Sequence, residues 1–93
     1  MKEETRPYGQ ILIDELKEKG HFMILTTRMN YSDIQELKSS DREGTLKAFK
    51  GSDYAFIQRI KNDSPSEVAD FLIERTLAAS NGALFTLMIM GGF

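Results

Sequence analysis

The sequence alternates between segments with helical periodicity and short runs of apolar residues, and this alternation constrains the fold more than any other feature. Helical periodicity places apolar residues three and four positions apart, whereas a buried strand is a short continuous apolar run. Segments of the first kind begin near residues 7, 32 and 64, and runs of the second kind occupy residues 22–25 and 83–90. Such an order is typical of small α/β domains, in which helices cover a sheet.

The first and last helical segments carry clear end signals. Residues 7–20 begin with a proline, which suits a first helical turn, and end with a glycine, which favours a helix stop. In residues 64–82, Ser64 precedes Pro65 and Glu67, which is the pattern of a capping box. The pair Asn81-Gly82 favours a left-handed stop. We therefore predict a helix over each segment, the second ending at this pair.

Residues 30–51 contain two further helix-start signals. Ser32 is followed three positions later by Gln35, and Ser40 is followed three positions later by Glu43. Both pairs fit a capping box. We predict two short helices, or one broken helix, ending at Gly51.

Three segments are predicted as strands. Residues 22–25 have no polar face, and residues 83–90 contain one polar residue, so both fit strands covered on two sides. Residues 52–61 are ambiguous, because a helix would align Tyr54, Ile57 and Lys61, which is the poorer match. A strand places alternate residues of this segment on one face, and the aromatic and β-branched content favours a strand at a sheet edge. The face consists of Tyr54, Phe56, Gln58 and Ile60.

The predicted fold is therefore α/β (or α+β). It is a small single-domain sandwich over residues 1–93, in which about three strands alternate with three to four helices in the order α-β-α(α)-β-α-β. Residues 1–5 are expected to be frayed. A sheet of this size exposes its edges, and exposed edges pair readily with another chain. We therefore expect a protein partner or a homo-oligomer.

Composition excludes several kinds of chemistry. The chain has no cysteine, which removes thiolate catalysis, iron–sulfur clusters and cysteine-based zinc sites, and favours a cytoplasmic setting. We expect no cofactor and no bound metal. No signal peptide is visible, and no apolar stretch approaches the ~20 residues that span a bilayer. The net charge is −2, and nucleic-acid binding is favoured by a clear excess of positive charge. The charge balance therefore does not favour nucleic acid as a partner.

One loop could bind a ligand. In open α/β sheets, ligands gather at the carboxyl ends of strands beside helix N-termini. The segment from Thr26 to Ser32 occupies such a place. Thr26 and Thr27 offer hydroxyl groups, Arg28 offers a planar guanidinium with five N–H donors, and Ser32 opens a helix. These four residues could hold a small anion or a nucleotide. The simpler interpretation is that the threonines finish a strand, the arginine is solvated, and Asn30 and Ser32 cap a helix. The glycines of a phosphate loop are missing.

A weaker alternative is nucleic-acid binding. Basic residues interleaved with aromatics can hold single-stranded nucleic acid. Five acidic residues share this part of the chain, and no RNA-binding motif is present, so we regard a nucleic-acid partner as unfavoured. The basic residues are Arg28, Arg42, Lys47, Lys50, Arg59 and Lys61, with Tyr54 and Phe56 between them.

The leading functional hypothesis is a non-catalytic protein-binding module, such as a small adaptor, subunit or inhibitor. It depends mainly on the lack of a catalytic triad, metal-ligand set or phosphate loop in the sequence. Tyr54, Phe56 and Arg59 are the predicted partner anchors, because tyrosine and arginine are enriched at binding hot spots. An enzyme whose chemistry comes from a cofactor or a partner chain stays open as an alternative.

Overall fold

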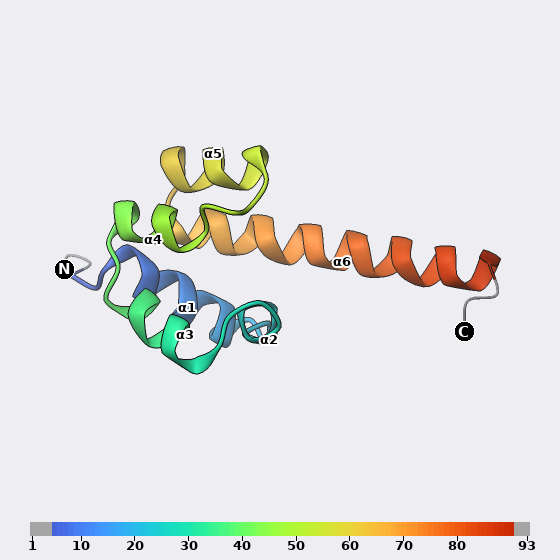
Figure 1. Cartoon of the computed structure of the whole chain (residues 1–93), viewed down its shortest axis with the longest axis horizontal. Coiled ribbons are helices and arrows are strands. Elements are labelled where there is room, and N and C mark those ends of the chain that lie inside the picture. The colour runs from blue at the N-terminus through green and yellow to red at the C-terminus, as the bar shows by residue number, and fades with distance from the viewer. Residues whose placement is uncertain (1–4, 91–93) are drawn as a thin grey trace.

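The computed structural model describes the backbone of residues 5–90 and the side chains of residues 5–78. These residues form six helices and no strand (Figure 1). The predicted α/β sandwich is therefore wrong, because the described part of the chain is all helical. The helices are α1 (Tyr8–Glu18), α2 (Met23–Thr26), α3 (Tyr31–Lys38), α4 (Arg42–Ala48), α5 (Tyr54–Asn62) and α6 (Pro65–Met90).

Helix α1 lies at the centre of the packing. It runs along the first half of α6, and both α3 and α4 pack against it (Figure 1). Helix α5 packs on α4 and α6, while α2 lies between α3 and α6. The buried side chains form one cluster to which every helix except α4 contributes an apolar residue, with one more from the loop after α4. They are Tyr8, Leu12, Ile13, Leu16, Ile24, Leu25, Ile34, Leu37, Phe49, Phe56, Ile60, Val68, Ala69 and Leu72.

The predicted end of the first helix and start of the last helix are confirmed. Gly20 has a φ of 76°, and its N–H donates to the Lys17 carbonyl at 3.0 Å. The His21 N–H donates to the Leu16 carbonyl at 2.8 Å, which completes a Schellman motif. At the start of α6, the Glu67 N–H donates to Ser64 Oγ at 3.2 Å, and the Ser64 N–H donates to Glu67 Oε1 at 3.0 Å. This is the predicted capping box.

The two short helices predicted in residues 30–51 are also present, and their caps are Asn30 and Asp41 in place of Ser32 and Ser40. Asn30 accepts the Asp33 N–H at 2.8 Å, and Asp41 accepts the Gly44 N–H at 2.8 Å. Each helix therefore starts one or two positions from the predicted serine, on a side chain that caps about as well as serine does.

The first predicted strand is the short helix α2. Ile24 and Leu25 are buried, whereas Met23 is 64 % exposed, so the apolar run is covered on one side only. The Schellman turn at Gly20 ends α1 directly before this run, and α2 then packs against α3 and α6. A single helical turn then suffices to bury two consecutive apolar side chains.

The second predicted strand, residues 52–61, corresponds to helix α5. Asp53 caps it by accepting the Phe56 N–H at 2.9 Å. Phe56 and Ile60 lie four positions apart, on one helical face, and both are buried. The aromatic and β-branched residues therefore belong to a helix, and the apolar face of that helix is only two turns long.

The third predicted strand, residues 83–90, is the second half of α6. The helix runs through Asn81-Gly82 without ending there and continues past the other helices (Figure 1). Residues 1–4 of the terminus expected to fray lie outside the described residues. Over residues 5–90, none of the helices combines the length and the apolar composition that a bilayer crossing requires.

Candidate functional site

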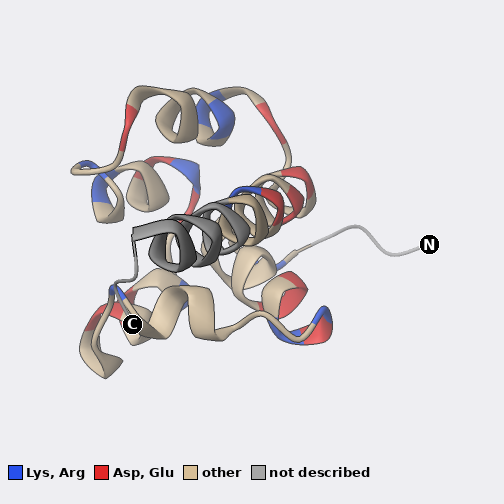
Figure 2. Ribbon diagram, turned by 90° about the vertical axis from the view of Figure 1, so that its right-hand side faces the viewer, with Lys and Arg blue, Asp and Glu red and all other residues tan. Residues whose placement is uncertain are grey.

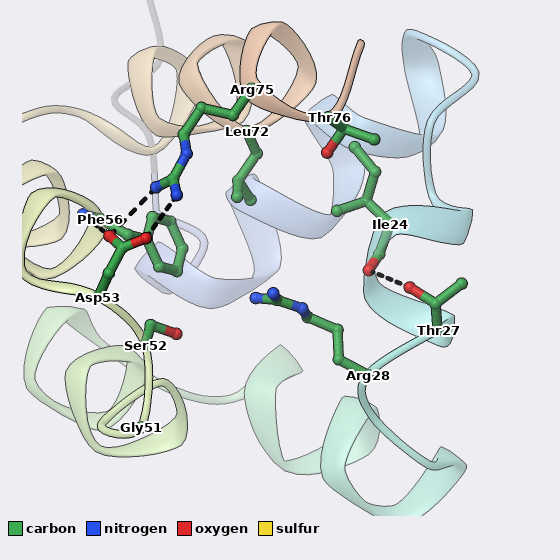
Figure 3. A pocket seen from close by; sticks show the side chains of 10 residues that line it. All are labelled: Ile24, Thr27, Arg28, Gly51, Ser52, Asp53, Phe56, Leu72, Arg75 and Thr76. Atoms are coloured by element: carbon green, nitrogen blue, oxygen red, sulfur yellow. Dashed lines mark hydrogen bonds and ion pairs between the residues drawn. The ribbon is translucent and has the colours of Figure 1, made fainter. Parts of the chain in front are cut away.

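A pocket of about 570 Å³ opens between the end of α2, the loop before α5 and the middle of α6 (Figure 3). This volume is typical of sites that accept a small ligand or a few side chains. The lining combines an apolar floor with hydroxyl and charged groups around it. The residues are Ile24, Phe56 and Leu72 (apolar), Thr27, Ser52 and Thr76 (hydroxyl), Arg28, Asp53 and Arg75 (charged), and Gly51.

The floor of the pocket is part of the hydrophobic core. Ile24, Phe56 and Leu72 are each less than a tenth exposed. Phe56 packs edge-on against Phe49, with ring centroids 5.0 Å apart, and in parallel against Phe71 at 6.4 Å. Core packing therefore fixes the shape of the apolar part of the pocket.

An ion pair joins two walls of the pocket. Arg75 of α6 donates from Nη1 to Asp53 Oδ1 at 3.1 Å and from Nη2 to Asp53 Oδ2, so the pair is bidentate (Figure 3). The Arg75 guanidinium also lies 5.2 Å from the centroid of the Phe71 ring. These contacts tie the start of α5 to α6 and hold Arg75 in one orientation.

The two partners shift each other's pKa in opposite directions. The hydrogen bond from Arg75 lowers the pKa of Asp53 from 3.8 to about 2, helped by the Phe56 N–H and by the charges of Arg75 and Arg28. The same pairing raises the pKa of Arg75. Asp53 is therefore ionised at neutral pH, and its charge offsets that of Arg75.

Arg28 is the second cation of the pocket. Its side chain extends from the end of α2 into the pocket, toward Ser52 and Phe56 (Figure 3). Among the described residues it has no hydrogen-bond or ion-pair partner, and its charge reaches Asp53 only through space. The pocket thus carries two guanidinium groups and one carboxylate, which gives it one net positive charge. An arrangement of this kind can bind an anionic group.

The structure brings together only part of the predicted anion site. Thr27 and Arg28 line the pocket, whereas Thr26 and Ser32 do not. The Thr27 hydroxyl already donates to the Ile24 carbonyl at 3.0 Å, and that of Thr26 donates to the Met23 carbonyl at 3.1 Å. The predicted setting at a strand end is wrong, because these residues end helix α2.

The three predicted partner anchors lie on α5 and have different surroundings. Phe56 is 2 % exposed and belongs to the core. Arg59 pairs with Asp63 at 2.9 Å and lies 4.6 Å from the Phe71 ring centroid. Tyr54 is 77 % exposed and is available for a partner. The predicted strand face therefore does not exist. Two of its three anchors, Tyr54 and Arg59, are exposed, and Arg59 is already paired within the protein.

The basic residues considered for nucleic acid are dispersed. Figure 2 shows Lys and Arg interspersed with Asp and Glu over the bundle. Arg42 is engaged by the protein itself, since it donates to the carbonyls of Ile60 at 2.8 Å and Lys61 at 2.7 Å and lies over the Tyr8 ring. Arg59 is engaged as well. The nucleic-acid hypothesis gains no support from this distribution.

Sequence reasoning missed Ser52, Asp53, Arg75 and Thr76. Asp53 was detectable, because a carboxylate three residues before the buried Phe56 fits a helix N-cap. Arg75 was not, because it is 47 positions from Arg28 and only the packing of α6 brings the two into one pocket. Among the described residues, no group of three or more histidine, cysteine, aspartate or glutamate side chains could hold a metal ion.

The lowered pKa of Asp53 predicts a pH dependence of stability. A carboxylate with a depressed pKa in the folded state stabilises the fold above its ordinary pKa, and this contribution is lost as the pH falls through the folded value. Asp53→Asn keeps a capping side chain but removes the charge. We expect the variant to melt below the wild type at pH 7, and the difference in Tm to shrink between pH 4 and pH 2. Thermal unfolding followed by circular dichroism measures this, and a constant difference down to pH 2 would contradict the pairing.

Some exposed apolar residues are next to pocket-lining residues in the sequence. Met23, Tyr54 and Leu77 are 64 %, 77 % and 50 % exposed, and each is the chain neighbour of a lining residue. We refer to these three residues as the rim. A fourth, Tyr31 at 78 %, lies on α3 and has no lining residue next to it. Comparison of the chain with protein-family models, curated proteins and solved structures finds no match.

Proposed function

We propose that this chain is a non-catalytic protein-binding module that receives its partner at the rim and the pocket between α2, α5 and α6. The observation that carries the proposal is that the three exposed apolar residues of the rim are the chain neighbours of lining residues on three separate helices or their ends. Protein interfaces favour apolar and aromatic side chains at their centre together with arginine. The binding surface is helical, and it replaces the sheet edge expected from the sequence.

The chemistry of the pocket supports binding. Its groups are guanidinium forks, hydroxyls and an apolar floor, which recognise shape and charge. The carboxylate of Asp53 is occupied by Arg75. The cysteine-free sequence is in keeping with a cytoplasmic setting.

The test is photo-cross-linking from two matched positions. A photoreactive phenylalanine analogue replaces Tyr54 in one variant and Tyr31 in another, since both tyrosines are exposed to the same degree. We expect cross-linking in the native lysate to give a discrete adduct from position 54 and none, or a much weaker one, from position 31. Equal adducts from both positions, or none from position 54, would overturn the proposal.

Once the partner is purified, affinity provides the second readout. We expect Tyr54→Ala and Met23→Ala together to weaken binding by at least tenfold, since exposed aromatic anchors dominate interface energies. The Tyr31→Ala control should change the affinity by less than about twofold, with all three proteins equally folded. Isothermal titration calorimetry measures the affinities.

A second candidate function is a regulatory domain that binds a free anion or nucleotide in the same pocket. This function is favoured because the Arg28 guanidinium has no ion-pair partner among the residues whose side chains are described. Thermal unfolding with added phosphate and ATP tests it. Ligand at a hundredfold excess over its Kd raises the stability by about 2.7 kcal/mol, and Arg28→Ala should abolish that rise.

A further inference from the structure

Of the two arginines in the pocket, Arg28 is the one that can accept a new anionic partner. Arg75 is held by Asp53 in a bidentate pair and lies over the Phe71 ring. A ligand that took Arg75 would leave the Asp53 carboxylate uncompensated. The Arg28 guanidinium makes no hydrogen bond or ion pair with the described residues, so a ligand that pairs with it displaces no such partner.

The surroundings of Arg28 direct an anion to one side of it. A second pocket of about 410 Å³ lies against Arg28, Gly51 and Ser52, and its lining includes the carboxylates of Asp33 and Glu36. An incoming negative charge is repelled there. On the side of the first pocket, the Asp53 carboxylate is neutralised by Arg75, so the charge of Arg28 is left to attract an anion.

The apolar floor sets a second requirement on the ligand. Ile24, Phe56 and Leu72 form that floor. The pocket volume of about 570 Å³ lies in the range of sites that bind a drug-sized ligand. A bare inorganic anion would leave this apolar surface in contact with water. A peptide that carries an apolar side chain next to a carboxylate satisfies both requirements at once.

We infer that the pocket binds an acidic segment of the partner protein, in which a Glu or Asp carboxylate pairs with Arg28 and a neighbouring apolar side chain packs on Phe56, Ile24 and Leu72. The inference rests on the proposed function, because it names the partner chemistry of the same surface. The guanidinium fork of Arg28 matches a carboxylate in bidentate geometry. The Ser52 hydroxyl, toward which Arg28 extends, is placed to donate a further hydrogen bond (Figure 3).

The experiment is an NMR titration of the full chain labelled with ¹⁵N. The probes are a blocked hexapeptide of alternating leucine and glutamate, the same peptide with glutamine for glutamate, the same peptide with serine for leucine, and inorganic phosphate. We expect the leucine–glutamate peptide to shift the Arg28 side-chain N–H signal and the backbone amides of Ser52 and Phe56. Glutamine or serine in the peptide should weaken binding by about tenfold or more, since each removes one of the two contacts.

Two protein variants locate the effect. Arg28→Ala should weaken binding of the leucine–glutamate peptide by about tenfold or more. Its Tm should stay close to that of the wild type, because among the described residues the side chain has no hydrogen-bond or ion-pair partner and acts on Asp53 only through space. Lys50→Ala removes the same charge from an exposed residue that does not line this pocket, and it should leave the affinity within about twofold. Raising the salt concentration should weaken binding to the wild type, since an exposed charge pair is screened.

Three results would overturn the inference. They are phosphate binding as tightly as the peptide, an equal loss of affinity in Lys50→Ala, and the absence of any shift at Arg28 with the leucine–glutamate peptide. The first indicates a site for free anions, and the second an unspecific charge effect. Cross-linking from position 54 is independent of Arg28, so it separates a failure of this inference from a failure of the proposed function.

Discussion

Replacing Gly9 with alanine is expected to destabilise the fold by about 3 kcal/mol or more, since overpacking at a rigid contact is among the most costly single changes. A Cβ atom at position 9 would lie 2.0 Å from the Leu37 carbonyl oxygen. The Gly9 N–H also donates to the Ser40 carbonyl at 2.8 Å, which joins the start of α1 to the end of α3. Relief of the clash requires these two helices to separate, and that breaks the hydrogen bond.

Gly51 provides the matched control. A Cβ atom there meets nothing within 4 Å, and its φ lies outside the left-handed region. Gly51→Ala should therefore be neutral or stabilise the fold by about 0.4–1 kcal/mol, because alanine restricts the unfolded chain. Urea unfolding followed by circular dichroism gives both free energies. A cost below 1 kcal/mol at position 9 would mean that α1 and α3 do not approach as closely as the structure has them.

The helices that the sequence predicted correctly are those whose ends are set by local chemistry. A Schellman stop at Gly20 and a capping box at Ser64 depend on backbone and side-chain groups within six residues. Such signals are readable without knowing what the helix packs against. The serine caps predicted at Ser32 and Ser40 were wrong by one or two positions, because Asn30 and Asp41 cap the helices instead. Asn, Asp and Ser cap about equally well, so residue type alone does not decide which of two neighbours is the cap.

The predicted strands were wrong because a short apolar run does not specify its own conformation. Residues 22–25 could be buried on both faces of a strand or on one face of a helical turn, and only the packing against α3 and α6 decides. Residues 52–61 offered a helical signal in the pair Phe56 and Ile60, with Asp53 as cap. The strand interpretation gave more weight to β-propensity, which tertiary context overrides.

The candidate site was predictable only where it consists of neighbours in sequence. Thr27 and Arg28 were proposed as ligand residues and do line the pocket. The floor and the Asp53–Arg75 pair come from α5 and α6, and no local pattern places these helices beside α2. Long-range packing alone thus turns Arg28 from a solvated loop residue into a pocket cation that has no ion-pair partner among the described side chains.

Replacing Phe56 with alanine is expected to cost about 3–5 kcal/mol, which is the range for a large aromatic side chain removed from a core. Phe56 is 2 % exposed and contacts Phe49 and Phe71 through its ring. Its loss leaves a cavity beneath the pocket and removes two aromatic contacts, each worth roughly 0.5–1.5 kcal/mol. A chain of this size has roughly 5–15 kcal/mol of stability in total, so much of the margin disappears.

Tyr54, two positions earlier, is the control for this change. Its side chain is 77 % exposed, so Tyr54→Ala should alter the free energy of unfolding by no more than about 0.5 kcal/mol. Urea unfolding gives the loss of unfolding free energy in each variant. Comparing the two losses shows which side chain lies on the buried face of α5 and which on its exposed face. The strand expected from the sequence would place both residues on one face and make the two costs similar. Equal costs would therefore reject the helical register of α5, and with it the pocket floor on which the binding of an apolar side chain depends.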